Sequence, residues 1–149
     1  GVKILTKTLQ LRFVPSSIDL ALLVLRLWIG VSMLVLHGWA KFVGFAEQSA
    51  GFMDPFGIGP KASFALAVLA EVMGSVLIIL GLFTRLGALL GGVTMAVAFF
   101  IAHDGKLSGA GNGELAFIYL AAYTTLFLAG GGRYAVDMKI AAAAAPKSV

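Results

Sequence analysis

The stretch from Leu20 to Trp39, LALLVLRLWIGVSMLVLHGW, decides the fold, and its only charged residue is Arg26. An apolar run of this length matches a bilayer core, which an α-helix crosses in about 20 residues. A helix is required there, because backbone N–H and C=O groups in lipid must pair within their own segment. This stretch therefore predicts an integral membrane protein.

The composition of the whole chain supports the same class. Of its 149 residues, 60% are hydrophobic and 12% are charged, and the mean hydropathy is +0.99. A soluble domain of ordinary composition is about 45–50% apolar and about 25% charged. Here too few charged residues remain to cover a water-exposed surface, and the length allows one domain.

Three further apolar stretches have the length of membrane spans. They run over residues 62–83, 86–102 and 114–129, and glycines 130–132 end the last one. Pro60 precedes the second span, where proline suits the first helical turn. The prediction is an all-α, four-helix transmembrane bundle with up-down topology.

The remaining segments flank this bundle. Residues 1–19 are predicted to be an interfacial helix or a flexible segment, residues 20–138 the bundle, and residues 139–149 a flexible tail. Residues 42–61 form the longest connection and carry four phenylalanines. Such a loop is too apolar for open water, so we expect it to fold back onto the bundle as a lid.

The distribution of Lys and Arg predicts the orientation, since cytoplasmic loops carry the excess of basic residues. Both termini are therefore predicted to be cytoplasmic. One side of the membrane would hold Lys3, Lys7, Arg12, Arg85, Arg133, Lys139 and Lys147, and the other would hold Lys41, Lys61 and Lys106.

Arg26 and Glu71 are charged residues inside predicted spans. A charge in a span is costly unless it is paired, and antiparallel helices would bring these two to similar depths. We expect a buried ion pair between them. It either pins two helices together or lines a path for a ligand or for protons.

Four ionisable residues gather by topology at the outer mouth of the bundle: His37, Lys41, His103 and Glu114. Histidine titrates near neutral pH, so this set could bind the polar head of a ligand or relay protons. The alternative is that helix ends are simply polar. The spacing matches no metal-ligand motif, so we expect no metal site. We also find no catalytic motif and no nucleic-acid-binding feature.

Several motifs occur in a fixed order along the chain: LRLWIG at 25–30, HGWAKF at 37–42, AEVMGSVLIILGLFTRLGALLGGVTM at 70–95, and GGGRYAVD at 130–137. Together with His103 and Glu114, this set resembles the DoxX family over about residues 20–138. The resemblance implies a four-helix bacterial inner-membrane protein. Members serve as membrane subunits of quinone-linked redox systems, such as thiosulfate:quinone oxidoreductase, or assemble with enzymes of oxidative-stress and thiol defence.

Three functions follow as alternatives. The first is a membrane subunit of a quinone-linked or oxidative-stress redox system, with a quinone as the ligand and a protein partner in the membrane. The second is a non-catalytic accessory subunit that packs against a larger complex. The third is a small transporter or lipid-binding protein, and this class is disfavoured because a transporter usually has inverted repeats with broken helices and the sequence shows neither. The chain has no cysteine, which argues against direct thiol chemistry.

Overall fold

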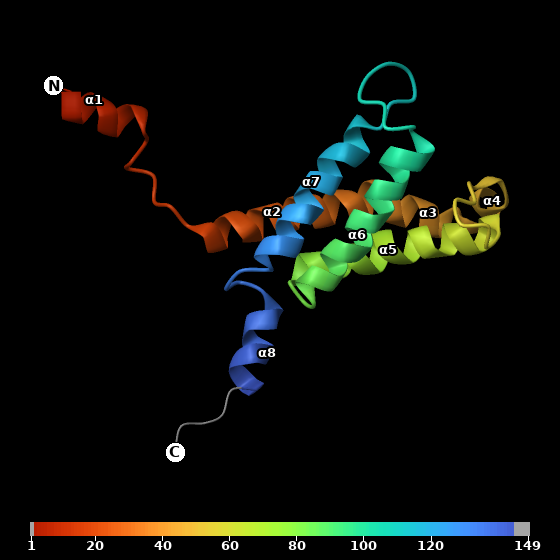
Figure 1. Cartoon of the computed structure of the whole chain (residues 1–149). Coiled ribbons are helices and arrows are strands. Elements are labelled where there is room, and N and C mark those ends of the chain that lie inside the picture. Colours follow the sequence, from red (N-terminus) through yellow and green to blue (C-terminus); the bar gives the residue numbers. More distant parts are fainter. Residues whose placement is uncertain (1, 145–149) are drawn as a thin grey trace.

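The computed structural model describes residues 2–144, which form helices and turns with no strand in that range (Figure 1). Short π-helical or 3-10 turns carry the label η. The elements are α1 (Val2–Leu9), α2 (Ile18–Met33), η1 (Leu34–Gly38), α3 (Trp39–Val43), α4 (Phe45–Gln48), η2 (Ser49–Gly51), α5 (Pro60–Leu80), α6 (Thr84–Val97), η3 (Ala98–Ala102), α7 (Glu114–Ala129) and α8 (Val136–Ala144).

Within residues 2–144, three helical runs are long and apolar enough to cross a membrane. The first is continuous through α2, η1 and α3, from Ile18 to Val43, and the third joins α6 to η3. The first run begins where the Ser17 hydroxyl accepts a hydrogen bond from the Leu20 N–H (3.2 Å), an N-cap contact. The membrane class predicted from the sequence is therefore supported by helix length as well as by composition.

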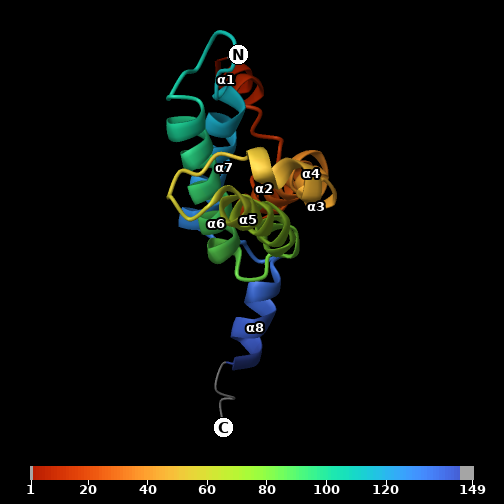
Figure 2. The same ribbon diagram turned by 90° about the vertical axis from the view of Figure 1, so that its right-hand side faces the viewer.

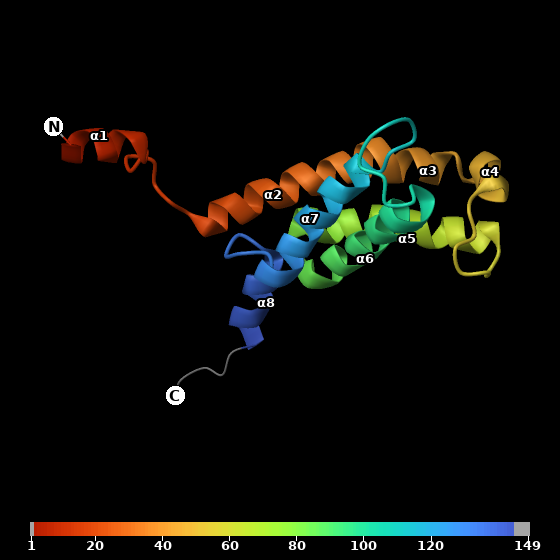
Figure 3. The ribbon, with the colours of Figure 1, turned by 45° about the horizontal axis from the view of Figure 1, so that its top comes forward.

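The fourth predicted span is shorter than the other three. Helix α7 has 16 residues, which at 1.5 Å per residue makes about 24 Å, against about 30 Å for a bilayer core. It packs mainly on α6 and also touches α2. Figure 3 shows α2 and α5 lying along each other, with α6 and α7 as a second pair.

Helix α1 stands away from the bundle (Figure 1), and α8 leaves it near the α5–α6 turn and points away from it (Figures 1 and 2). Helix α1 has no buried residue, and neither has α8. Helix α8 includes residues 139–144 of the C-terminal tail, where alanine favours a helix. The rest of that tail, including Lys147, lies outside the described residues.

The long connection between the first two spans folds back onto α5, as predicted. The rings of Phe45 and Phe52 pack against buried Phe64 at centroid distances of 5.3 and 4.9 Å. We call this end of the bundle the loop end, and the opposite end, with the α5–α6 turn at residues 81–83, the hairpin end.

Candidate functional site

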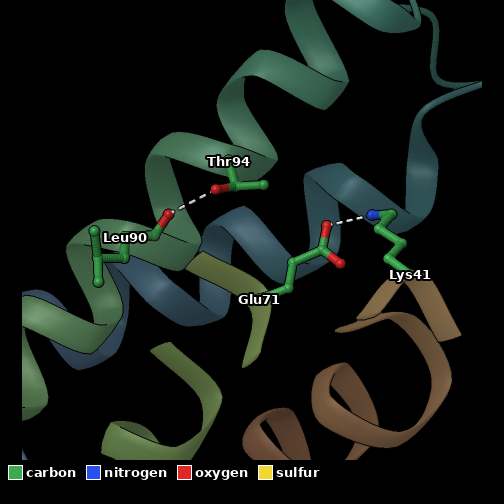
Figure 4. Close-up of polar contacts among 4 residues, drawn as sticks. All are labelled: Lys41, Glu71, Leu90 and Thr94. Carbon is green, nitrogen blue, oxygen red and sulfur yellow. Dashed lines mark hydrogen bonds and ion pairs between the residues drawn. The ribbon is translucent and has the colours of Figure 1, made fainter. Parts of the chain in front are cut away.

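An ion pair joins α3 to α5 inside the bundle. The Lys41 ammonium donates to Oε1 of Glu71, and Figure 4 shows the two side chains pointing toward each other. The Glu71 side chain is 2% exposed and the Lys41 side chain 28% exposed. A carboxylate this deeply buried requires a partner of opposite charge, and Lys41 provides it.

A glycine makes this pairing geometrically feasible. A Cβ atom added at Gly38 would lie 3.1 Å from the carbonyl carbon of Glu71 and 3.2 Å from its carbonyl oxygen. The helix that carries Lys41 therefore approaches the backbone of α5 more closely than a larger residue at this position would permit. Lys41 follows Gly38 by almost one turn and so emerges beside Glu71.

The second oxygen of the carboxylate is left without a partner. Oε2 of Glu71 is buried, and nothing in residues 2–144 donates a hydrogen bond to it. A buried acceptor without a partner costs about 1–3 kcal/mol, more when it is charged. Structures retain such atoms where a ligand or a water molecule supplies the missing donor.

Glu71 and Lys41 line a cavity of about 440 Å³ between α5 and α6. This volume lies within the usual range for small-molecule sites, about 300–1,000 Å³. Its walls are mostly aliphatic, and Phe52, Met53, Pro55 and Phe56 of the folded-back connection close one side. Leu66, Leu69, Leu89 and Val93 of the walls are exposed on the protein surface, so the cavity borders the face that would meet lipid.

Two hydroxyl groups add polarity to these walls. Thr94 donates its proton to the carbonyl of Leu90 (2.9 Å, Figure 4), and Ser63 donates its proton to Oδ1 of Asp54 (2.8 Å). Both residues line the cavity, and each hydroxyl, its proton already committed, can act there only as an acceptor.

Asp54 fixes the connection beside the cavity. Its carboxylate accepts hydrogen bonds from the Ser63 hydroxyl and from the N–H groups of Ile58 (3.0 Å) and Gly59 (2.9 Å). These bonds, that of Ser63 above all, hold the pKa of Asp54 below its ordinary value. The carboxylate thereby ties the residues before Pro60 to the first turn of α5.

The predicted pair between Arg26 and Glu71 is wrong in its partners, although both side chains are buried. Arg26 donates from Nη1 to the carbonyls of Ile78 (3.2 Å) and Ile79 (3.1 Å), and from Nη2 to the carbonyl of Tyr134 (3.1 Å). It therefore satisfies carbonyls at the C-terminus of α5, where a helix favours positive charge.

The register of the helices explains the error. Glu71 lies beside Gly38, and Arg26 precedes Gly38 by about three turns, roughly 18 Å along the axis. The continuous helix Ile18–Val43 is longer than α5 and extends past it at the hairpin end, so Arg26 is level with the end of α5 rather than with its middle.

The four residues predicted at the outer mouth do not form one contiguous set. No hydrogen bond or ion pair within residues 2–144 joins any two of them. His37 lies edge-on to the Tyr119 ring at 5.9 Å, and His103 Nδ1 lies 2.8 Å from the carbonyl oxygen of Gly111. Glu114 is exposed at the start of α7. Only Lys41 of the four lines the cavity.

The family is decided by comparison with known proteins, since a family model described as DoxX matches residues 21–104. The chain belongs to the DoxX family. A protein of Haemophilus influenzae is 36% identical to it over 115 residues, covering 72% of this chain and 81% of the relative. "Putative oxidoreductase CatD" of Bacillus subtilis is 31% identical over 114 residues, covering 76% of this chain and 81% of the relative. No solved structure matches significantly.

The range matched by the DoxX model includes every residue that lines the cavity, Lys41 and Glu71 among them. Sequence reasoning selected both residues but did not join them. Ser63 and Thr94 were not predicted as site residues, because a single hydroxyl residue in an apolar span does not by itself indicate a site. The motif GGGRYAVD was noted, but not that its last residue, Asp137, bonds the backbone N–H groups of Phe83 and Thr84 at the start of α6.

Proposed function

We propose that this DoxX protein is the membrane subunit of a quinone-linked or oxidative-stress redox system and that it holds the quinone in the cavity between α5 and α6. One observation carries the proposal: a buried ion pair, Lys41–Glu71, on the floor of a largely aliphatic cavity of about 440 Å³. The name of the Bacillus subtilis relative, which contains the word oxidoreductase, supports the same class of function.

The chemistry of the cavity suits a quinone. The ring and an isoprenoid tail are apolar and would be shielded by the aliphatic walls and by Phe52 and Phe56. The ring oxygens need polar partners, which the Lys41 ammonium and the Glu71 carboxylate can supply. The exposed apolar residues at the border of the cavity would let a tail pass into the lipid.

The proposal includes the orientation predicted from the basic residues. The protein would cross the bacterial inner membrane four times with both termini in the cytoplasm, which requires α7 to span despite its 16 residues. The loop end would then be periplasmic, and the quinone would bind in that half of the bundle. His37, His103 and Glu114 would lie near the periplasmic surface, where they could exchange protons with water.

Electrons would be exchanged with a protein partner in the membrane complex. The chain has no cysteine and therefore no ligand for an iron–sulfur cluster and no redox thiol of its own. The role of this chain would be to bind the quinone, orient it and provide polar groups at its oxygens.

The test is to purify the protein from its native membrane and to measure what accompanies it. We expect extractable quinone in the wild type and less in Lys41→Met, with a redox enzyme as a co-purifying partner. Asp104→Asn is the matched control, because it breaks an exposed lysine–carboxylate pair with Lys106 outside the cavity.

The alternative, a non-catalytic accessory subunit, predicts another result. The protein would then co-purify in a fixed stoichiometry with a large complex and with lipid, but without quinone. Lys41→Met would leave the co-purifying molecules unchanged. That outcome would overturn the proposal of quinone binding.

A further inference from the structure

The polar side chains that line the cavity between α5 and α6 offer mainly hydrogen-bond acceptors. Ser63 and Thr94 have given their protons to Asp54 and to the Leu90 carbonyl. The Glu71 carboxylate bonded to Lys41 has no proton to offer, and its Oε2 has no partner within the described residues. Among the side chains that line this cavity, Lys41 alone keeps N–H or O–H protons beyond those already used in a hydrogen bond.

From this inventory we infer that the cavity selects the reduced form of its ligand, a quinol whose hydroxyl groups donate hydrogen bonds, over the oxidised quinone. The inference rests on the proposed function and adds the redox state of the ligand. A quinol can donate one hydroxyl proton to Glu71 and leave its second hydroxyl for Thr94 or Ser63. A quinone has only acceptor oxygens, so among these side chains only Lys41 can donate a hydrogen bond to it.

The selectivity is expected to be substantial because the site is buried. A quinone would leave Glu71 Oε2 without a donor while excluding water from it, whereas a quinol supplies the missing donor. Sites built to bond a hydroxyl group discriminate strongly against analogues without one. A hydrogen bond to a charged acceptor corresponds to about a tenfold or larger change in affinity.

Binding measurements on the purified full chain in nanodiscs test this. The probes are a short-tail benzoquinone and the same compound after chemical reduction, titrated without oxygen. We expect the reduced compound to bind the wild type at least about tenfold more tightly than the oxidised one.

Two variants locate the origin of the preference. Glu71→Gln places an amide N–H₂ where the carboxylate was, and this amide can donate to a quinone carbonyl. In Glu71→Gln, the reduced compound should therefore bind no more tightly than the oxidised one. Thr94→Val keeps the shape of the side chain and removes one acceptor, so it should weaken binding of the quinol about threefold or more and leave that of the quinone unchanged. Thr94→Val provides the test if Glu71→Gln fails to fold, and Asp104→Asn is the control.

The outcomes separate the two claims. If neither form binds the wild type, quinone binding is wrong and this inference falls with it. If both forms bind equally and neither variant changes their ratio, the inference is wrong while quinone binding stands. A preference for the reduced form that Glu71→Gln or Thr94→Val diminishes supports both.

Discussion

Asp137 closes the N-terminus of α6 at Thr84, which lies 53 positions earlier in the chain. One carboxylate oxygen of Asp137 accepts from both the Thr84 N–H (2.9 Å) and the Thr84 hydroxyl (2.8 Å), and the other accepts from the Phe83 N–H (2.6 Å). Phe83, the N-cap position of α6, makes no side-chain capping bond itself. A residue of α8 therefore supplies the cap that the local sequence lacks.

This cap predicts a dependence of stability on pH. Partial burial would raise the pKa of Asp137, but the hydrogen bonds from Thr84 and Phe83, helped by the charge of Arg26, outweigh it and hold the pKa below the ordinary 3.8. A carboxylate with a lowered pKa stabilises the fold fully above its unfolded pKa, and this contribution is lost as the pH falls through the folded pKa. Unfolding in mixed detergent micelles should therefore become easier below about pH 4. Asp137→Asn should show a smaller loss over that range, whereas Asp104→Asn should follow the wild type.

Asp137 caps the start of α6, and Arg26 caps the end of α5 just before it in the same α5–α6 hairpin. Its guanidinium donates to the carbonyls of Ile78 and Ile79. Replacing Arg26 with Met should leave the carbonyls of Ile78, Ile79 and Tyr134 without their donor. The bond to Ile78 is buried and the other two are partly buried. A buried acceptor that loses its partner costs about 1–3 kcal/mol, so we expect a loss of at least about 1 kcal/mol of unfolding free energy. Arg26→Lys should recover only part of it, because an ammonium cannot reproduce the geometry of the guanidinium. Arg12→Met, at an exposed residue, is the control, and an equal stability of Arg26→Met and Arg12→Met would contradict this role.

These contacts show what the sequence could and could not predict. Hydropathy and length predicted the helices, because burial in lipid requires apolar runs of fixed length whatever their neighbours are. Which partner each charged residue finds depends on two features of the packing: the axial stagger of the helices, which follows from the longer first helix, and the close approach at Gly38. These features decide the contacts of Arg26, Lys41 and Glu71. Hydropathy carries no information about such a stagger, so the sequence identified the charged residues and misassigned their pairs.

Gly38 offers a direct test of the close approach between the first helix and α5. Gly38→Ala should force the first helix away from α5, because the added Cβ would meet the Glu71 backbone at 3.1 Å. We expect a loss of about 1–3 kcal/mol of unfolding free energy, as in overpacked cores, together with weaker ligand binding. Gly92→Ala is the matched control, since the nearest atom to its added Cβ would lie 3.6 Å away, and a helical Gly→Ala change should be neutral or stabilising. Equal effects of the two changes would refute a special role for Gly38.

The ion pair can be tested for function separately from stability. Replacing one partner of a buried pair costs about 3–5 kcal/mol, whereas replacing both with apolar residues is often neutral or stabilising. We therefore expect Lys41→Met/Glu71→Leu to be at least as resistant to unfolding as the wild type, while Glu71→Leu alone is less resistant. Thermal unfolding in detergent measures the difference. The double variant should nevertheless lose quinol binding; full binding at normal stability would show that the pair is only structural.

The residues at the loop end provide the last test, since they distinguish the cavity from the mouth as the place of binding. His103 contacts the Gly111 carbonyl of its own loop, and Glu114 is exposed, so neither touches the cavity between α5 and α6. We expect His103→Ala to lower the protein yield or the melting temperature slightly, and Glu114→Gln to change neither by much. Affinity for the short-tail quinol, measured on folded protein, should stay within about twofold in both, because a change of that size is below the contribution of one hydrogen bond. A tenfold loss of affinity at normal yield in either variant would indicate that the head group binds at the mouth of the bundle and not beside Lys41 and Glu71.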